Sequence, residues 1–93
     1  MFKRWYLSRL QTEIDQRGTQ IAEEKTRAAA ASETVRAEHH KLIAAAEGKG
    51  RDLSLRVEEL RKSGKEHHAE FKAMVEVARV GFGDAVRAAH RFA

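Results

Sequence analysis

Apolar residues recur at every seventh position along both halves of the chain, a spacing typical of helices that pack along a narrow seam. In the first half the stripe comprises Leu7, Ile14, Ile21, Ala28, Val35 and Leu42. In the second half a matching stripe comprises Val57, Gly64, Phe71, Ala78, Ala85 and Phe92. The pattern therefore predicts two long helices that lie side by side.

The segment Gly48-Lys49-Gly50 predicts a tight turn between these helices. When the chain is folded back about Lys49, large residues of one stripe meet small residues of the other, as where Ala28 faces Phe71. A glycine suits the residue after a helix end, and Asp52 can cap the next helix. We therefore expect an all-α fold: a single domain (1–93) that forms a long, coiled-coil-like antiparallel two-helix hairpin, with helices 2–47 and 52–91 and a turn at 48–51.

An alternative boundary lies near Ser63. The segment Ser63-Gly64-Lys65-Glu66 has the Ser-x-x-Glu spacing of a capping box, which can begin a new helix. The heptad spacing nevertheless runs through this segment without a skipped residue, which favours one continuous second helix. A three-helix arrangement broken near Ser63 is the alternative.

Charged residues interrupt the expected seam. Arg17, Glu24 and Glu38 would face apolar residues of the second helix, and burying an unpaired charge is very costly. These side chains must reach solvent or find partners. Such a thin seam buries little apolar surface per residue, so we expect the hairpin to pair into a four-helix bundle, either with a second copy or with another protein.

The composition fits this picture and limits the chemistry. The chain contains no proline and six glycines, which favours helix, and no cysteine, which excludes disulfides, thiolate nucleophiles and cysteine-based zinc sites. No apolar run approaches the ~20 residues that cross a bilayer, and charges interrupt the first ten residues, unlike a signal peptide. We expect a cytoplasmic protein.

The net charge is only mildly basic. Eighteen basic and fourteen acidic residues give +4, and the two signs are interleaved along the chain, as on a solvated helix surface. The densest basic stretch, residues 49–65, also contains acidic residues and matches no motif that binds DNA or RNA. A nucleic-acid partner is therefore not favoured.

No spacing of side chains favours catalysis or metal binding. The histidine doublets His39-His40 and His67-His68 place adjacent rings about 100° apart on a helix, whereas a shared metal requires residues three or four apart. Nucleophile, base and orienting acid occur at no suitable spacing, and no phosphate-binding glycine loop is present. We expect no catalytic residue, no metal, no cofactor and no small-molecule substrate.

Aromatic and basic residues gather near both ends of the sequence, beside the heptad stripes. A hairpin would bring the two ends to one tip, rich in the residue types that dominate protein interfaces. The residues expected to bind a partner are Phe2, Arg4, Trp5, Tyr6, Arg9, Phe82 and Val86.

These features favour a non-catalytic protein–protein interaction module, such as a small adaptor, inhibitor or assembly subunit. Its partner would be a second copy, another protein, or both. The alternative is a peripheral membrane-associated protein that uses its N-terminal aromatic and basic segment as an interfacial anchor. A third interpretation is that the aromatic residues simply cap the ends of the helices.

Overall fold

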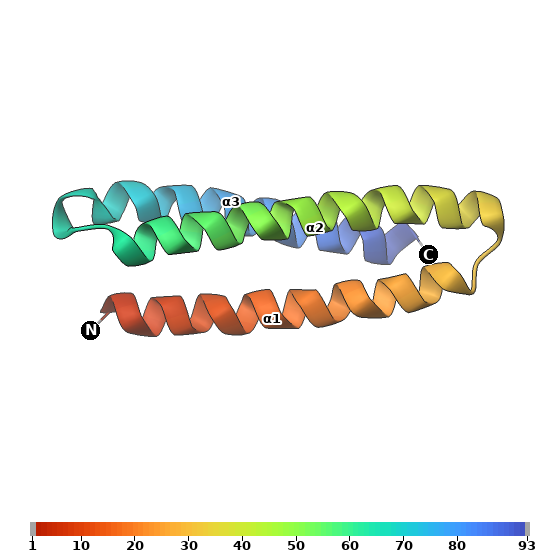
Figure 1. Cartoon of the computed structure of the whole chain (residues 1–93), viewed down its shortest axis with the longest axis horizontal. Coiled ribbons are helices and arrows are strands. Elements are labelled where there is room, and N and C mark those ends of the chain that lie inside the picture. Colours follow the sequence, from red (N-terminus) through yellow and green to blue (C-terminus); the bar gives the residue numbers. More distant parts are fainter. Residues whose placement is uncertain (1, 93) are drawn as a thin grey trace.

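The computed structural model describes residues 2–92, which form three long helices and one short one. They are α1 (Phe2–Ala29), α2 (Glu33–Lys62), the 3₁₀ helix η1 (Lys65–His67) and α3 (His68–Phe92). Each long helix runs antiparallel to the one before it, and the termini lie at opposite ends (Figure 1). The bundle measures 51 × 18 × 17 Å. The prediction of an all-α fold is confirmed.

The predicted two-helix hairpin is wrong. Residues 48–51, expected to form the turn between helices 2–47 and 52–91, lie inside α2. The chain instead reverses after Ala29 and again at Ser63 and Gly64. The three-helix arrangement broken near Ser63, which the sequence left as the alternative, is therefore the closer description.

The first reversal is made by alanines and a serine. The N–H groups of Ala30 and Ala31 donate to carbonyls three residues back, at 3.2 and 3.1 Å, which tightens the last turn of α1. Ser32 then takes an extended conformation (φ −62°, ψ 159°). Its carbonyl accepts a hydrogen bond of 2.8 Å from the N–H of Arg36, which begins α2. The acidic residue Glu33 in the first turn suits the positive end of the helix dipole.

Ser63 closes α2 rather than capping the following helix. Its N–H and its hydroxyl both donate to the carbonyl of Leu60, at 3.1 and 2.8 Å. Gly64 is extended and leads directly into η1. The ammonium group of Lys3 donates to the carbonyl of Ser63 at 2.9 Å, so this reversal is also tied to the start of α1.

Gly50 serves packing instead of a turn. A Cβ atom at this position would lie 3.0 Å from Cε1 and 3.1 Å from Cζ of Phe82, so the missing side chain lets the aromatic ring approach α2. No glycine in residues 2–92 has a positive φ. Gly50 therefore resembles a turn residue in the sequence because close helix packing and tight turns favour the same residue.

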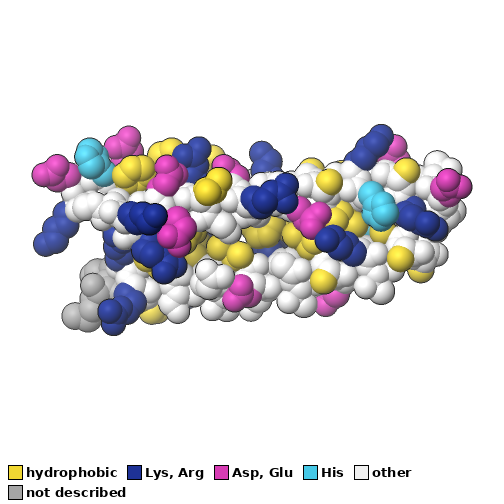
Figure 2. Space-filling view, in the orientation of Figure 1, with side chains coloured by type: hydrophobic (Ala, Val, Ile, Leu, Met, Phe, Trp, Pro, Cys, Tyr) yellow, Lys and Arg dark blue, Asp and Glu magenta, His cyan; other side chains and the backbone are white. Residues whose placement is uncertain are grey.

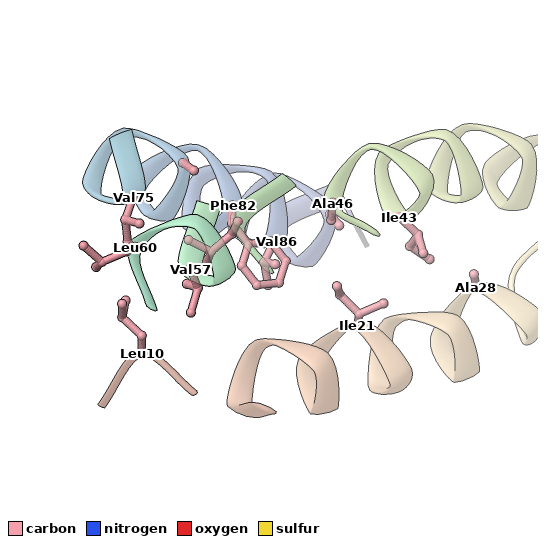
Figure 3. Close-up of a cluster of buried hydrophobic side chains, with 13 residues drawn as sticks. Leu10, Ile21, Ala28, Ile43, Ala46, Val57, Leu60, Val75, Phe82 and Val86 are labelled. Atoms are coloured by element: carbon pink, nitrogen blue, oxygen red, sulfur yellow. The ribbon is translucent and has the colours of Figure 1, made fainter. Parts of the chain in front are cut away.

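The core runs along the axis between the three helices, and α2 and α3 pack against each other more extensively than α1 packs against either. Figure 3 shows apolar side chains from all three helices pointing into this space. Buried apolar residues are Leu10, Ile21, Ala28, Ile43, Ala46, Leu53, Val57, Leu60, Val75, Ala78, Phe82, Val86 and Ala89. Val35, a member of the predicted stripe, is 41 % exposed because the helices meet in a different register.

The surface carries charges of both signs. Basic and acidic side chains are interleaved over the face in Figure 2, with apolar side chains between them. Across residues 2–92, none of the helices has an apolar stretch of the length that crosses a membrane.

Candidate functional site

An exposed tryptophan lies between two arginines near the start of α1. Trp5 is 61 % exposed, and the guanidinium carbon of Arg9 lies 5.0 Å from the centroid of its ring. Residues four apart are neighbours on a helix surface, which allows this cation–π contact. Arg4 is exposed beside them. We call Arg4, Trp5 and Arg9 the basic-aromatic face.

The neighbours of Trp5 explain why it points outward. Leu10 is buried, and Tyr6 and Leu7 are partly buried against the core. With these positions filling the inward side of the first turns, Trp5 is left on the outer side of α1. Its exposure argues against the interpretation that this tryptophan merely caps the core.

Tyr6 fastens α1 to α3 and is not freely presented. Its hydroxyl donates to the carboxylate of Glu76, and the ammonium nitrogen of Lys72 lies 4.9 Å from the centroid of its ring. Arg79 continues the network, with its guanidinium 2.5 Å from Glu13 and 3.2 Å from Glu76. Burial raises the pKa of the Tyr6 hydroxyl above its ordinary value, and the bond to the Glu76 carboxylate raises it further.

The remaining residues predicted to bind a partner do not join this face. Phe82 and Val86 are core residues, 3 % and 2 % exposed, and the side chain of Phe2 lies outside the part of the chain that the structure describes. The prediction of one tip containing both termini is wrong, because three antiparallel helices place the termini at opposite ends (Figure 1).

The basic-aromatic face has an unbalanced charge. Within the described residues, no ion pair joins Arg4 or Arg9 to a carboxylate, whereas nearby Arg61 and Arg79 pair with acidic residues. Trp5 and Arg9 also line a groove of about 670 Å³ that reaches Arg79 on α3. The face therefore combines an aromatic surface with uncompensated positive charge.

A second polar site is buried near the opposite end of the bundle. Glu24 and His39 are 2 % and 0 % exposed, and His39 Nε2 lies 3.2 Å from Glu24 Oε2. Arg27 Nη1 donates to Glu24 Oε2 at 2.8 Å, and His90 Nδ1 lies 3.1 Å from Glu24 Oε1. We call Glu24, Arg27, His39 and His90 the buried polar cluster, and it joins all three long helices.

The protonation of this cluster follows from its contacts. Burial by itself raises the pKa of the Glu24 carboxyl, but hydrogen bonds from His90, Arg27 and His39 outweigh it, so the pKa is lowered. His39 Nε2 also lies 2.9 Å from the carbonyl oxygen of Ala89, which can only accept. Nε2 therefore bears the proton that both oxygens share, while Nδ1 is buried without a partner.

The buried polar cluster is arranged for structure rather than chemistry. Glu24 and His39 are closed off from solvent, so a substrate has no access to their reactive atoms. Arg27 Nη1 lies 2.8 Å from Glu24 Oε2 and 3.2 Å from His90 Nδ1, where it supplies the positive charge that a cation would otherwise bring. Within residues 2–92, no group of His, Cys, Asp and Glu side chains is arranged to hold a metal ion.

One part of this cluster could be predicted from the sequence, and the rest could not. The expectation that Glu24 must find partners or reach solvent is confirmed, because Arg27, His39 and His90 surround it. The hairpin register placed His39 far from Glu24, so the pairing between helices was not predicted. The available signal was a lone carboxylate at a seam position, with Arg27 three residues later.

Comparisons with family models, curated proteins and solved structures find no match to this chain.

Proposed function

We propose that the protein is a non-catalytic interaction module that binds an acidic surface of another protein through the basic-aromatic face. The observation that supports this most directly is the 61 % exposure of Trp5 between Arg4 and Arg9. Tryptophan and arginine are the residue types most enriched among the residues that dominate binding energy. A small adaptor, inhibitor or assembly subunit fits such a surface.

Trp5 can contribute a substantial part of the binding energy at this face. A buried tryptophan removes about 150–250 Å² from water, and roughly 25 cal/mol per Å² is gained on burial. Covering the exposed part of Trp5 would therefore contribute on the order of 2–4 kcal/mol. Arg4 and Arg9 would add charge-assisted hydrogen bonds to carboxylates of the partner and speed its approach.

A protein partner is favoured over a membrane because few apolar side chains are available at this end of α1. Leu7 and Leu10 would have to enter the lipid with Trp5, but they pack against the core. A single tryptophan is a weak anchor compared with the apolar face of an interfacial helix. The membrane remains the second candidate on the strength of the adjacent basic residues, and a cytoplasmic location stays a prediction.

The experiment is a selection of displayed peptides on the immobilised protein, with counter-selection on the variant Trp5→Ala. Selected peptides are then titrated against the free protein while its fluorescence is recorded. Trp5 is the sole tryptophan of the chain, so the signal reports on this face alone. We expect peptides rich in acidic and apolar residues, a blue shift on binding, and weaker binding at high salt.

The control variant is Thr19→Ala, which changes an exposed residue farther along α1, outside the groove beside Trp5, and should bind like the unaltered protein. The double variant Arg4→Glu/Arg9→Glu should lose binding. A blue shift with vesicles of anionic lipid but with no peptide would replace the proposal with the membrane alternative. The absence of any response would reject both.

Self-association, which the heptad pattern predicted as a four-helix bundle of two hairpins, also remains a proposal. Because the chain forms three long helices, it does not supply the two-helix hairpins that this bundle requires. Association with a second copy stays a proposal.

A further inference from the structure

The middle of the outer side of α3 is apolar although it faces away from the core. Val77 and Val80 are 75 % and 59 % exposed, and Ala73 is exposed one turn before Val77. The core side of the same helix is also apolar and contains Val75, Phe82 and Val86. Exposed apolar residues on the side of a helix opposite its core side are typical of a surface that a partner covers.

The apolar outer side continues into a groove against α2. Met74, Val77 and Gly81 line this groove, which measures about 350 Å³ and is bordered by Lys49 and Arg56. Gly81 is open enough that a Cβ there would meet only Cδ of Lys49, at 3.9 Å. Exposed valines beside an open groove provide both a projection and a recess for a partner helix.

We propose that this surface binds the same surface of a second copy, with the two α3 helices antiparallel. Residues of the outer side follow a heptad in which Glu70, Val77 and Asp84 alternate with Ala73, Val80 and Arg87. Antiparallel pairing about the midpoint of residues 78 and 79 places Val77 against Val80 of the second copy, and Val80 against its Val77. The two-fold symmetry repeats each contact.

The charges of the outer side select this partner and this orientation. The same register places Glu70 against Arg87 of the second copy, and Arg87 against its Glu70. Both side chains are available, because Glu70 and Arg87 are 70 % and 52 % exposed, and in the described chain their ion pairs are with His67 and Asp84 of the same helical segment. Glu70 and Arg87 lie at opposite ends of this surface, so each is complementary to the same surface of a second copy when the helices are antiparallel, and the register places Asp84 against Ala73 of the second copy.

This inference concerns a different helix from the basic-aromatic face and goes beyond the proposed function. Its test is the molar mass of the protein by light scattering, from about 1 to about 500 µM, a range that spans the affinities of weak interfaces. We expect the mass to rise from monomer to dimer. The variant Val77→Asp should remain monomeric throughout, with unchanged helix content, because Val77 makes little contact within the bundle.

The register is tested by exchanging charges. Glu70→Arg alone and Arg87→Glu alone each create two like-charge pairs across the interface, and each should weaken the dimer on the order of tenfold. An equimolar mixture of the two variants restores complementary charges in both pairs. The mixture should therefore dimerise about as well as the unaltered protein, although neither variant does so by itself.

The matched control is Leu55→Asp, which introduces the same charge at an exposed apolar residue of α2 that is 66 % exposed and lies in a different groove. It should leave dimerisation intact. A monomer at every concentration would overturn the proposal. A dimer that survives Val77→Asp, or a mixture of charge variants that is not restored, would also overturn it. None of these outcomes affects the test of the basic-aromatic face.

Discussion

The substitution Glu24→Gln tests whether the buried polar cluster holds the three helices together. The carboxylate accepts from Arg27 and His39 and lies 3.1 Å from His90 Nδ1. Glutamine has nearly the same shape but offers one accepting oxygen, and its amide group would face one of these three nitrogens. The amide nitrogen is buried at this position and would be a donor that faces another donor, although His39 Nε2 keeps the carbonyl of Ala89 as an acceptor.

The magnitude follows from the exposure of each partner. The side chains of Arg27 and His90 are 39 % and 74 % exposed, so solvent screens their interactions with Glu24 and they contribute little. The contact with His39 is wholly buried, and a buried hydrogen bond to a charged group is worth about 1.5–3 kcal/mol. We expect Glu24→Gln to lower the free energy of unfolding by about 2 kcal/mol, and Tm by about 8–16 °C for a chain of this size.

The assay is thermal and urea unfolding followed by circular dichroism at neutral pH. Glu23→Gln is the matched control, because it removes the same charge from the adjacent, exposed position of α1. If the two variants unfold within about 0.5 kcal/mol of each other, the cluster does not stabilise the bundle and the reasoning is refuted.

The same cluster sets a pH dependence. The pKa of Glu24 is lowered in the folded protein, so its contribution to stability is present above the pKa of the unfolded chain, about 4.3, and is lost as pH falls through the lower folded value. Between about pH 5 and pH 3, the unaltered protein should therefore lose more stability than Glu24→Gln. If the stability of the two proteins changed with pH in parallel, the pKa of Glu24 would be the same in the folded and unfolded states, which would contradict this prediction.

Three further predictions follow from the packing of the helices. Gly18→Ala should raise the free energy of unfolding by roughly 0.5–1 kcal/mol, because a Cβ there meets nothing within 4 Å. Gly50→Ala should lower it by about 1 kcal/mol, because the added Cβ would press on the ring of Phe82. Urea unfolding of both variants and the unaltered protein measures the two effects. Tyr6 is the sole tyrosine, so ultraviolet titration should place its pKa above the ordinary value of about 10, and Glu76→Gln should lower it. Hydrogen exchange should be faster in α1 than in α2 and α3, because α1 makes fewer contacts, and equal rates would contradict this.

The helical content of the chain could be predicted from its sequence, but the place where it turns could not. Heptad spacing and the lack of proline describe helices without saying where each one ends. Gly50 looked like a turn residue because the ring of Phe82, the reason for a glycine there, is distant in the sequence. The true first turn at Ala30–Ser32 has no glycine or proline, and its signal was only a serine followed by Glu33.

The candidate site was predictable where it depends on local spacing. Trp5 and Arg9 are four residues apart, so their contact follows from the helix alone. The hairpin prediction placed Phe82 at the terminal tip instead of the core, because the position of this residue depends on how many times the chain reverses direction. The pairing of Glu24 with His39 required the correct register between α1 and α2, which no single-helix pattern contains.

The position of α1 depends on polar contacts more than on apolar ones. Among the side chains that the structure describes, Leu10, Ile21 and Ala28 are its buried apolar residues, fewer than in α2 or α3, so apolar packing specifies its register less strongly. At one end Lys3 bonds to Ser63 and Tyr6 to Glu76, and at the other end Glu24 bonds to His39. Because a shift of one turn would break the contacts at both ends together, these bonds fix the register of α1. They thereby determine the position of the basic-aromatic face on the bundle. The position of the outer side of α3 depends instead on the more extensive packing between α2 and α3.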